Sequence, residues 1–241
     1  MAELHWHAST SAGSADGTAA VGQGAWHLAV ELPAGTLQNA AATLPWSMTE
    51  EEKIFMNGYQ TWTECPELGK WNRQRGTDQI PRFLREKYAF DRYGDYHFVR
   101  YGKKKGQSHG FSYCYFRRGE HYRLAASLNE TPGYTIFYYD AKAQTLRIER
   151  DCAGVHHEGG KFAALDLFFA EGSEDEVFDA WFAALGCRAR RTKKLEGYSS
   201  WYNRYQDITE DTIREDLTGC RSLLCPGDLF QIDDGWEPKV G

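Results

Sequence analysis

The chain has 241 residues, of which 41% are hydrophobic and 26% are charged, and its formal net charge is −6. This balance is typical of a globular protein, and the short cationic clusters at 103–105 and 188–194 are too isolated for a nucleic-acid-binding surface. No window approaches the roughly 20 apolar residues of a membrane span, and the first residues lack the basic and apolar parts of a signal peptide. We therefore expect a cytoplasmic protein with no nucleic-acid or membrane partner.

Aromatic residues are abundant, with eight Trp, fourteen Tyr and thirteen Phe. Such a surplus suits strand packing in an all-β domain, and it also suits carbohydrate binding, because flat aromatic rings cover the C–H faces of sugars. The six cysteines are scattered without a CxxC pair or a neighbouring histidine cluster. The sequence therefore predicts neither a zinc site nor a disulfide framework.

Residues 3 to about 171 carry β signals. Strand-length runs rich in aromatic and β-branched residues alternate with turn sequences such as NETPG and HHEGGK. The runs lie at 25–32, 96–102, 110–119, 121–128, 134–140, 145–151 and 162–172. Strands at this spacing, with no helical stretch between them, predict a large antiparallel β-sandwich.

The pattern becomes helical at 173–186. Ser173 and Glu176 form a capping-box signature, one face of the segment is apolar, and Gly186 is a natural stop. The basic stretch 187–194 that follows has no regular pattern. We therefore expect a β-sandwich domain over 1–186, a linker over 187–194 and a second domain over 195–241.

The second domain begins with a strand-like stretch at 195–202. A predicted helix over 208–224 follows, with Thr209 as its N-cap, and a second strand is expected at 228–234. A strand, a helix and a strand within about forty residues predict a βα unit with parallel strands.

Polar and aromatic residues follow both predicted strands of this unit. Trp201 lies at the end of the first strand, and Asp233 and Asp234 lie at the end of the second. Ligands of parallel α/β folds bind at the carboxyl ends of strands, so these side chains are candidates for polyol binding. Spacing alone does not separate this role from a helix cap or an ion-paired turn for the acids, or from core packing for Trp201.

Three segments resemble one enzyme family. GYSSWYNRYQDITEDTI (197–213) and LFQIDDGWEPKVG (229–241) are similar to the start of the catalytic barrel in family 36 glycoside hydrolases, the α-galactosidases, and above all to the bacterial members. MNGYQTWTEC (56–65) resembles the segment that reaches from the family's β domain toward the active site. The three segments occur in the family's order, and they cover about a quarter of the chain.

The resemblance implies a β-sandwich followed by a TIM (β/α)8 barrel. It implies that Asp233 and Asp234 hydrogen-bond galactose hydroxyls, notably those at positions 4 and 6, and that Trp201 lines the same subsite. Trp62, with Tyr59 beside it, would be contributed by the N-terminal domain. The implied substrate is an α-galactoside oligosaccharide such as melibiose or raffinose, and the implied reaction needs no metal or organic cofactor.

The family retains anomeric configuration by using two carboxyl groups roughly 5 Å apart. The resemblance places the nucleophile and the acid/base downstream of Gly241, so the expected chain is an inactive N-terminal fragment with a truncated barrel. A galactosyltransferase of the raffinose-synthase type would share these motifs. A non-catalytic, carbohydrate-binding β-sandwich is a third reading, and a homo-oligomer with a site shared between subunits also stays open.

Overall fold

The computed structural model describes residues 2–58, 65–74, 80–88, 104–188 and 194–237. The chain divides into two compact units, Met1–Arg188 (unit 1) and Ala189–Gly241 (unit 2). The division falls within the segment 187–194 that the sequence assigns to a linker. The expected strand at 96–102 lies outside the described residues.

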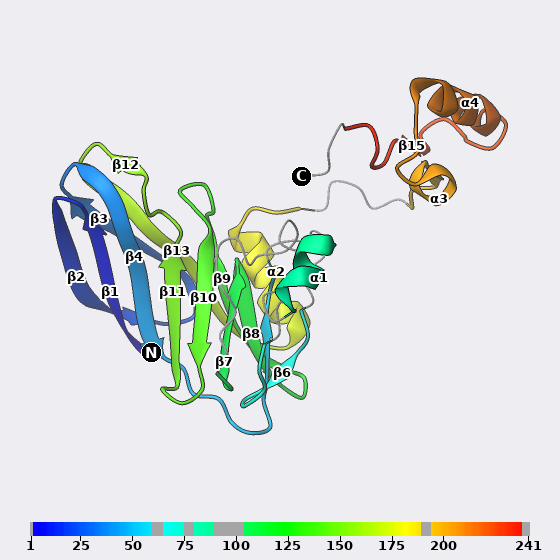
Figure 1. Cartoon of the computed structure of the whole chain (residues 1–241). Helices are drawn as coiled ribbons and strands as arrows, with labels where there is room; N and C mark the ends of the chain where they lie inside the picture. The colour runs from blue at the N-terminus through cyan, green and yellow to red at the C-terminus, as the bar shows by residue number, and fades with distance from the viewer. Residues whose placement is uncertain (1, 59–64, 75–79, 89–103, 189–193, 238–241) are drawn as a thin grey trace. The chain divides into compact units, whose positions relative to one another are not determined.

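Unit 1 contains two antiparallel sheets (Figure 1). The first sheet runs in the order β2 (Gly13–Val21), β1 (Ala2–Thr10), β4 (Gly35–Pro45), β11 (Thr145–Arg150), β10 (Thr135–Asp140) and β7 (Gln107–Phe111), with β12 (His156–His157) also pairing with β4. The second runs in the order β3 (Gly24–Leu32), β13 (Gly160–Gly172), β9 (His121–Ser127), β8 (Tyr113–Arg118), β5 (Lys53–Met56) and β6 (Leu68–Gly69). The expectation that the N-terminal part is antiparallel β is confirmed.

The two sheets share one hydrophobic core. Strand side chains alternate between faces, so Leu146 and Ile148 of β11 are fully buried while Arg147 between them is partly exposed. Side chains of the other sheet, including Phe116 and Leu165, belong to the same buried cluster. The opposite face of the β11 sheet is therefore free to carry polar side chains.

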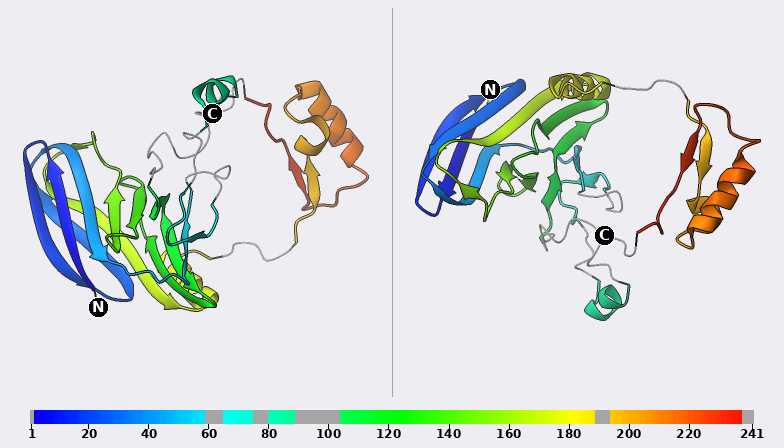
Figure 2. Two further views of the ribbon diagram at one scale, coloured as in Figure 1. Left: turned by 60° about the horizontal axis from the view of Figure 1, so that its bottom comes forward. Right: turned by 90° about the horizontal axis from the view of Figure 1, so that it is seen from above.

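Helix α2 (Glu174–Ala184) covers the outer face of the second sheet (Figure 2). It begins with the predicted capping box, in which Ser173 and Glu176 exchange hydrogen bonds. Val177 and Trp181 are its buried residues, and the Trp181 indole N–H donates to the Ser127 carbonyl of β9 at 2.9 Å. The only other helix in the described residues of this unit is α1 (Arg82–Lys87), which the sequence did not predict.

Unit 2 contains β14 (Gly197–Ser199), α3 (Trp201–Arg204), α4 (Glu210–Cys220) and β15 (Leu229–Gln231). β14 and β15 pair in parallel, as predicted, with Tyr198 opposite Phe230. The described residues of unit 2 form one parallel strand pair with its helices, and a barrel is not shown. No helix among the described residues of either unit is long and apolar enough to cross a membrane.

Both predicted strands of unit 2 are longer than the strands of the structure. The stretch 195–202 was expected to be a strand, but the chain turns helical at Ser200, whose carbonyl accepts from the Asn203 and Arg204 N–H groups. The second strand was expected to run to residue 234 but ends at Gln231. Trp201 therefore lies on a helical turn, and the two aspartates lie in a turn after their strand.

Candidate functional site

The elements of unit 2 are joined through the partly buried carboxylate of Asp216 on α4. It accepts from the Tyr198 hydroxyl at 2.6 Å and from Arg204 Nη2 at 2.9 Å. Arg204, with help from Tyr198, holds the pKa of Asp216 below its usual range. The Tyr198 ring also stacks on Phe230, with centroids 4.8 Å apart. These contacts join β14, α3, α4 and β15, and they fix where the two strands end.

Asp233 is held at these strand ends by hydrogen bonds from both strands. Its Oδ2 accepts from Ser199 Oγ at 3.3 Å and from Gln231 Nε2 at 2.9 Å. Its backbone N–H donates to the Oγ of the fully buried Ser200 at 2.9 Å. Its Oδ1 accepts the Asp234 N–H at 2.9 Å. Three of the roughly four acceptor positions of this carboxylate are therefore occupied within the chain.

Asp234 differs from its neighbour in this respect. Its side chain is half-buried, and no hydrogen bond or ion pair to its carboxylate is found among the described residues. A carboxylate can accept about four hydrogen bonds, so Asp234 has its acceptor capacity available for a ligand. The acid pair thus consists of one anchored carboxylate and one with free acceptor positions.

The turn that carries the acids packs against the turn after α3. Gly235 has φ of +103°, and a Cβ there would lie 2.4 Å from the Gln206 carbonyl oxygen, so this close approach requires glycine. On the other side, Tyr205 has φ of +54° and ψ of −131°, a conformation that non-glycine residues rarely adopt. The two turns therefore lie in contact, and one of them is strained.

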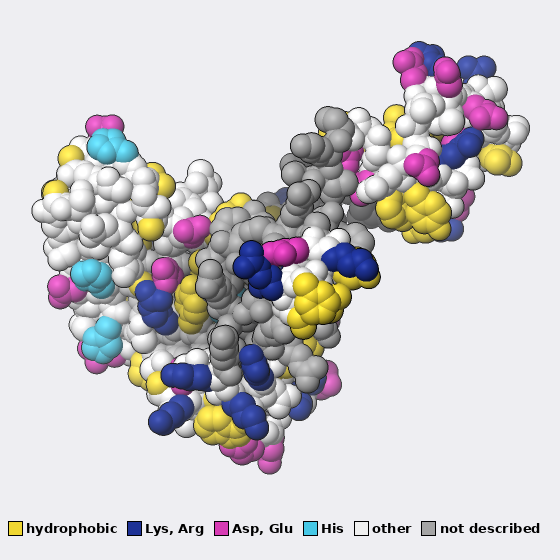
Figure 3. Space-filling model, in the orientation of Figure 1, with side chains coloured by type: hydrophobic (Ala, Val, Ile, Leu, Met, Phe, Trp, Pro, Cys, Tyr) yellow, Lys and Arg dark blue, Asp and Glu magenta, His cyan; other side chains and the backbone are white. Residues whose placement is uncertain are grey.

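Aromatic side chains project around these turns. Trp201 is half-buried and meets Tyr205 edge to face, with centroids 5.4 Å apart. The side chains of Tyr202, Tyr205 and Trp236 are largely exposed. Figure 3 shows hydrophobic side chains on the surface of unit 2 among acidic and basic ones. Exposed rings beside carboxylates match the chemical needs of a sugar, which presents apolar C–H faces as well as hydroxyl groups.

The predicted site residues are only partly described. Asp233 and Asp234 lie together, and the hydrogen bond from the Asp233 N–H to Ser200 Oγ brings the start of α3, where Trp201 lies, beside Asp233. Trp62 and Tyr59 lie outside the described residues. Sequence reasoning missed Gln231 and Tyr205. Gln231 carried a usable signal, because it lies two residues before Asp233 in the predicted strand, a spacing that puts both side chains on one side.

The arrangement can accept hydrogen bonds from a polyol at the carboxyl ends of two parallel strands. Among the described residues no group of three His, Cys, Asp or Glu side chains could hold a metal ion. Comparisons with family models, with curated proteins and with solved structures found no match to this chain. Inference about function therefore depends on the site itself and on the motif resemblance.

Proposed function

We propose that this chain supplies the galactose-binding residues of a retaining α-galactosidase that acts on oligosaccharides of the melibiose and raffinose type. The observation that carries the proposal is the anchored Asp233 beside the unbonded Asp234 at the carboxyl ends of parallel β14 and β15. In this proposal β14, α4 and β15 begin a TIM barrel, and the two sheets of unit 1 form its accompanying β-sandwich.

The difference in hydrogen bonding between Asp233 and Asp234 suits recognition of an axial hydroxyl. Because Ser199, Gln231 and Ser200 already fix Asp233, little side-chain freedom is lost when a sugar binds to its remaining acceptor position. Asp234 then accepts two neighbouring hydroxyls, as a carboxylate can. An epimer with an equatorial hydroxyl leaves one of these acceptors desolvated and unpaired, which costs binding energy.

The chain's residues in this proposal bind and orient the sugar, and no reacting carboxyl is assigned to them. Trp201 covers the apolar face of the galactose ring, while the acids hold its far edge. Fixing both sides of the ring orients the anomeric carbon toward the two carboxyl groups that a retaining enzyme requires. The same contacts to galactose would serve a galactosyltransferase, which differs in the molecule that receives the galactose rather than in the galactose subsite.

Binding of monosaccharides to the 241-residue chain tests the proposal. Ligand-observed NMR is recorded with D-galactose and with its 4-epimer D-glucose, for the wild type, Asp234→Asn and the control Asp211→Asn, whose carboxylate is exposed in the first turn of α4. We expect galactose to bind more tightly than glucose, and only Asp234→Asn to weaken it, by about two- to tenfold for a lost hydrogen bond. Equal binding of the two sugars, or no effect of Asp234→Asn, would refute the proposal.

A further inference from the structure

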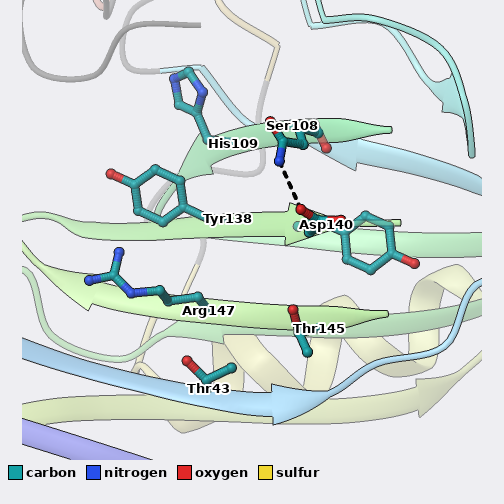
Figure 4. A pocket seen from close by; sticks show the side chains of 9 residues that line it. Thr43, Ser108, His109, Tyr138, Asp140, Thr145 and Arg147 are labelled. Atoms are coloured by element: carbon teal, nitrogen blue, oxygen red, sulfur yellow. Dashed lines mark hydrogen bonds between the residues drawn. The ribbon is translucent and has the colours of Figure 1, made fainter. Parts of the chain in front are cut away.

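The outward face of the first sheet of unit 1 carries a hollow of about 360 Å³. Two cross-strand rows of polar side chains line it. One row contains Thr43 of β4, Arg147 of β11, Tyr138 of β10 and His109 of β7, which are direct partners in the sheet register. The other row contains Thr145, Asp140 and Gln107, also direct partners. Figure 4 shows Tyr138 and Arg147 side by side at one end and Asp140 at the other.

The lining is fixed before any ligand arrives. Asp140 Oδ2 accepts from Gln107 Nε2 at 2.8 Å, and its Oδ1 accepts two N–H groups of the following turn. The Arg147 guanidinium lies 5.6 Å from the centre of the Tyr138 ring and is ion-paired with Glu149. Arg147 therefore has its position set by one ring and one carboxylate.

The same lining offers hydrogen-bonding groups to a guest. No hydrogen bond to the hydroxyls of Thr43, Thr145 or Tyr138 is found among the described residues. Burial raises the pKa of Tyr138 to about 12, so its hydroxyl stays neutral and can both donate and accept at physiological pH. The hollow thus combines three hydroxyls, a guanidinium, a carboxylate and the imidazole of His109 around one space.

Charge and polarity narrow the class of ligand. An anion would meet Arg147 already neutralised by Glu149, and Asp140 close by. A cation would meet the guanidinium, and an apolar ligand would leave the hydroxyls desolvated. A neutral, hydroxyl-rich ligand can pair with every one of these groups, and the volume lies at the small end for ligand pockets. We infer that this hollow is a second binding site, for one or two rings of a neutral oligosaccharide.

The site would act as a non-catalytic anchor on unit 1. It shares no residue with the acid pair of unit 2, so it does not depend on the proposed function. Only the anchoring role rests on the proposed function: an oligosaccharide held here would stay close to the chain between encounters with the galactose-binding acids, because a second attachment point raises the local concentration.

Two-dimensional ¹⁵N–¹H NMR of the full chain, titrated with raffinose, tests the inference. We expect shifts of the amides of β10 and β11, weakened about two- to tenfold by Tyr138→Phe or Thr145→Val, each of which removes one hydroxyl and preserves shape. Thr18→Val is the matched control, because Thr18 is an exposed strand residue on β2, outside the hollow. A preserved spectrum elsewhere shows that each variant is folded.

Asp234→Asn should leave these shifts unchanged, which separates this site from the one in unit 2. The inference is overturned if raffinose shifts none of these amides, or if Thr18→Val weakens binding as much as Tyr138→Phe. It is also overturned if sodium sulfate or glycerol shifts the same amides at equal concentration as strongly as raffinose does, because the hollow would then be an anion site or an unselective one.

Discussion

Replacement of Arg150 by methionine should be among the most destabilising single changes in unit 1. Arg150 is 1% exposed and lies at the end of β11. Its guanidinium donates to the carbonyl oxygens of Ala164 at 3.2 Å, of Gly133 at 2.8 Å and of Asn129, and it lies 3.8 Å from the Asp166 carboxylate. One buried cation therefore links β11 to β13 and to the turn at 129–133.

The magnitude follows from what methionine leaves behind. Its side chain keeps most of the packing of the arginine stem, but three carbonyl oxygens lose their donor, at about 1–3 kcal/mol for each group that stays dry. The turn carries two of these carbonyls and can open to water, because Thr131 within it is exposed. We therefore expect a loss of about 3–5 kcal/mol, the usual cost of removing one partner of a buried ionic network.

Urea unfolding of the full chain, followed by far-ultraviolet circular dichroism, measures this loss. At a slope of about 2 kcal/mol/M, the midpoint should fall by about 1.5–2.5 M. Arg118→Met is the control, because Arg118 and its partner Glu51 are both about two-thirds exposed, and its loss should stay under about 1 kcal/mol. A similar small loss for both arginines would show that the buried network does not hold the sheets together.

Two further changes probe unit 1. In the same urea assay, Gly133→Ala should lower the free energy of unfolding by roughly 2 kcal/mol or more beyond the loss for Gly119→Ala. Both glycines have positive φ, but only a Cβ at Gly133 would meet a carbonyl oxygen, that of Asp151, at 2.0 Å. Equal losses for the two variants would contradict this reasoning. The guanidinium of Arg117 lowers the pKa of Glu67, so the pair stabilises the fold above the ordinary carboxyl pKa and this contribution is lost as pH falls through the lowered value. Glu67→Gln should therefore reduce the unfolding midpoint near pH 7 and much less near pH 3, and a pH-independent loss would argue against the ion pair.

The parts of the fold that could be predicted from sequence are those specified by local pattern. The runs at 134–140 and 145–151, predicted from their aromatic and β-branched residues, are both strands. The capping box of Ser173 and Glu176 is a contact between residues three apart, so it can be read directly from the sequence. The expected strand runs did not include the hairpin of β1 and β2, because β2 consists mostly of small residues, and its Gly17 lies directly against Trp6 of β1.

The parts that could not be predicted depend on partners far apart in the chain. Ser200 leaves the strand because its hydroxyl and backbone bond to residues 231 and 233, which no local pattern around 200 encodes. The hollow needs Thr43, Arg147 and Tyr138 in one row, and that row exists only once the sheet register is set. The candidate acids were found because they lie next to each other, but their unequal bonding emerged only from the three-dimensional contacts.

Strand β13 also has a consequence for how the protein is made. Within the described residues β3 pairs only with β13, so residues 24–32 wait for partners that the ribosome adds roughly 130 residues later. At about 5–20 residues per second the delay is about 6 to 25 seconds. Throughout that time the emerging chain exposes an apolar strand with free backbone groups, the kind of segment that chaperones bind. The demand that this fold places on the cell is therefore greatest during translation, before its last long strand has left the ribosome.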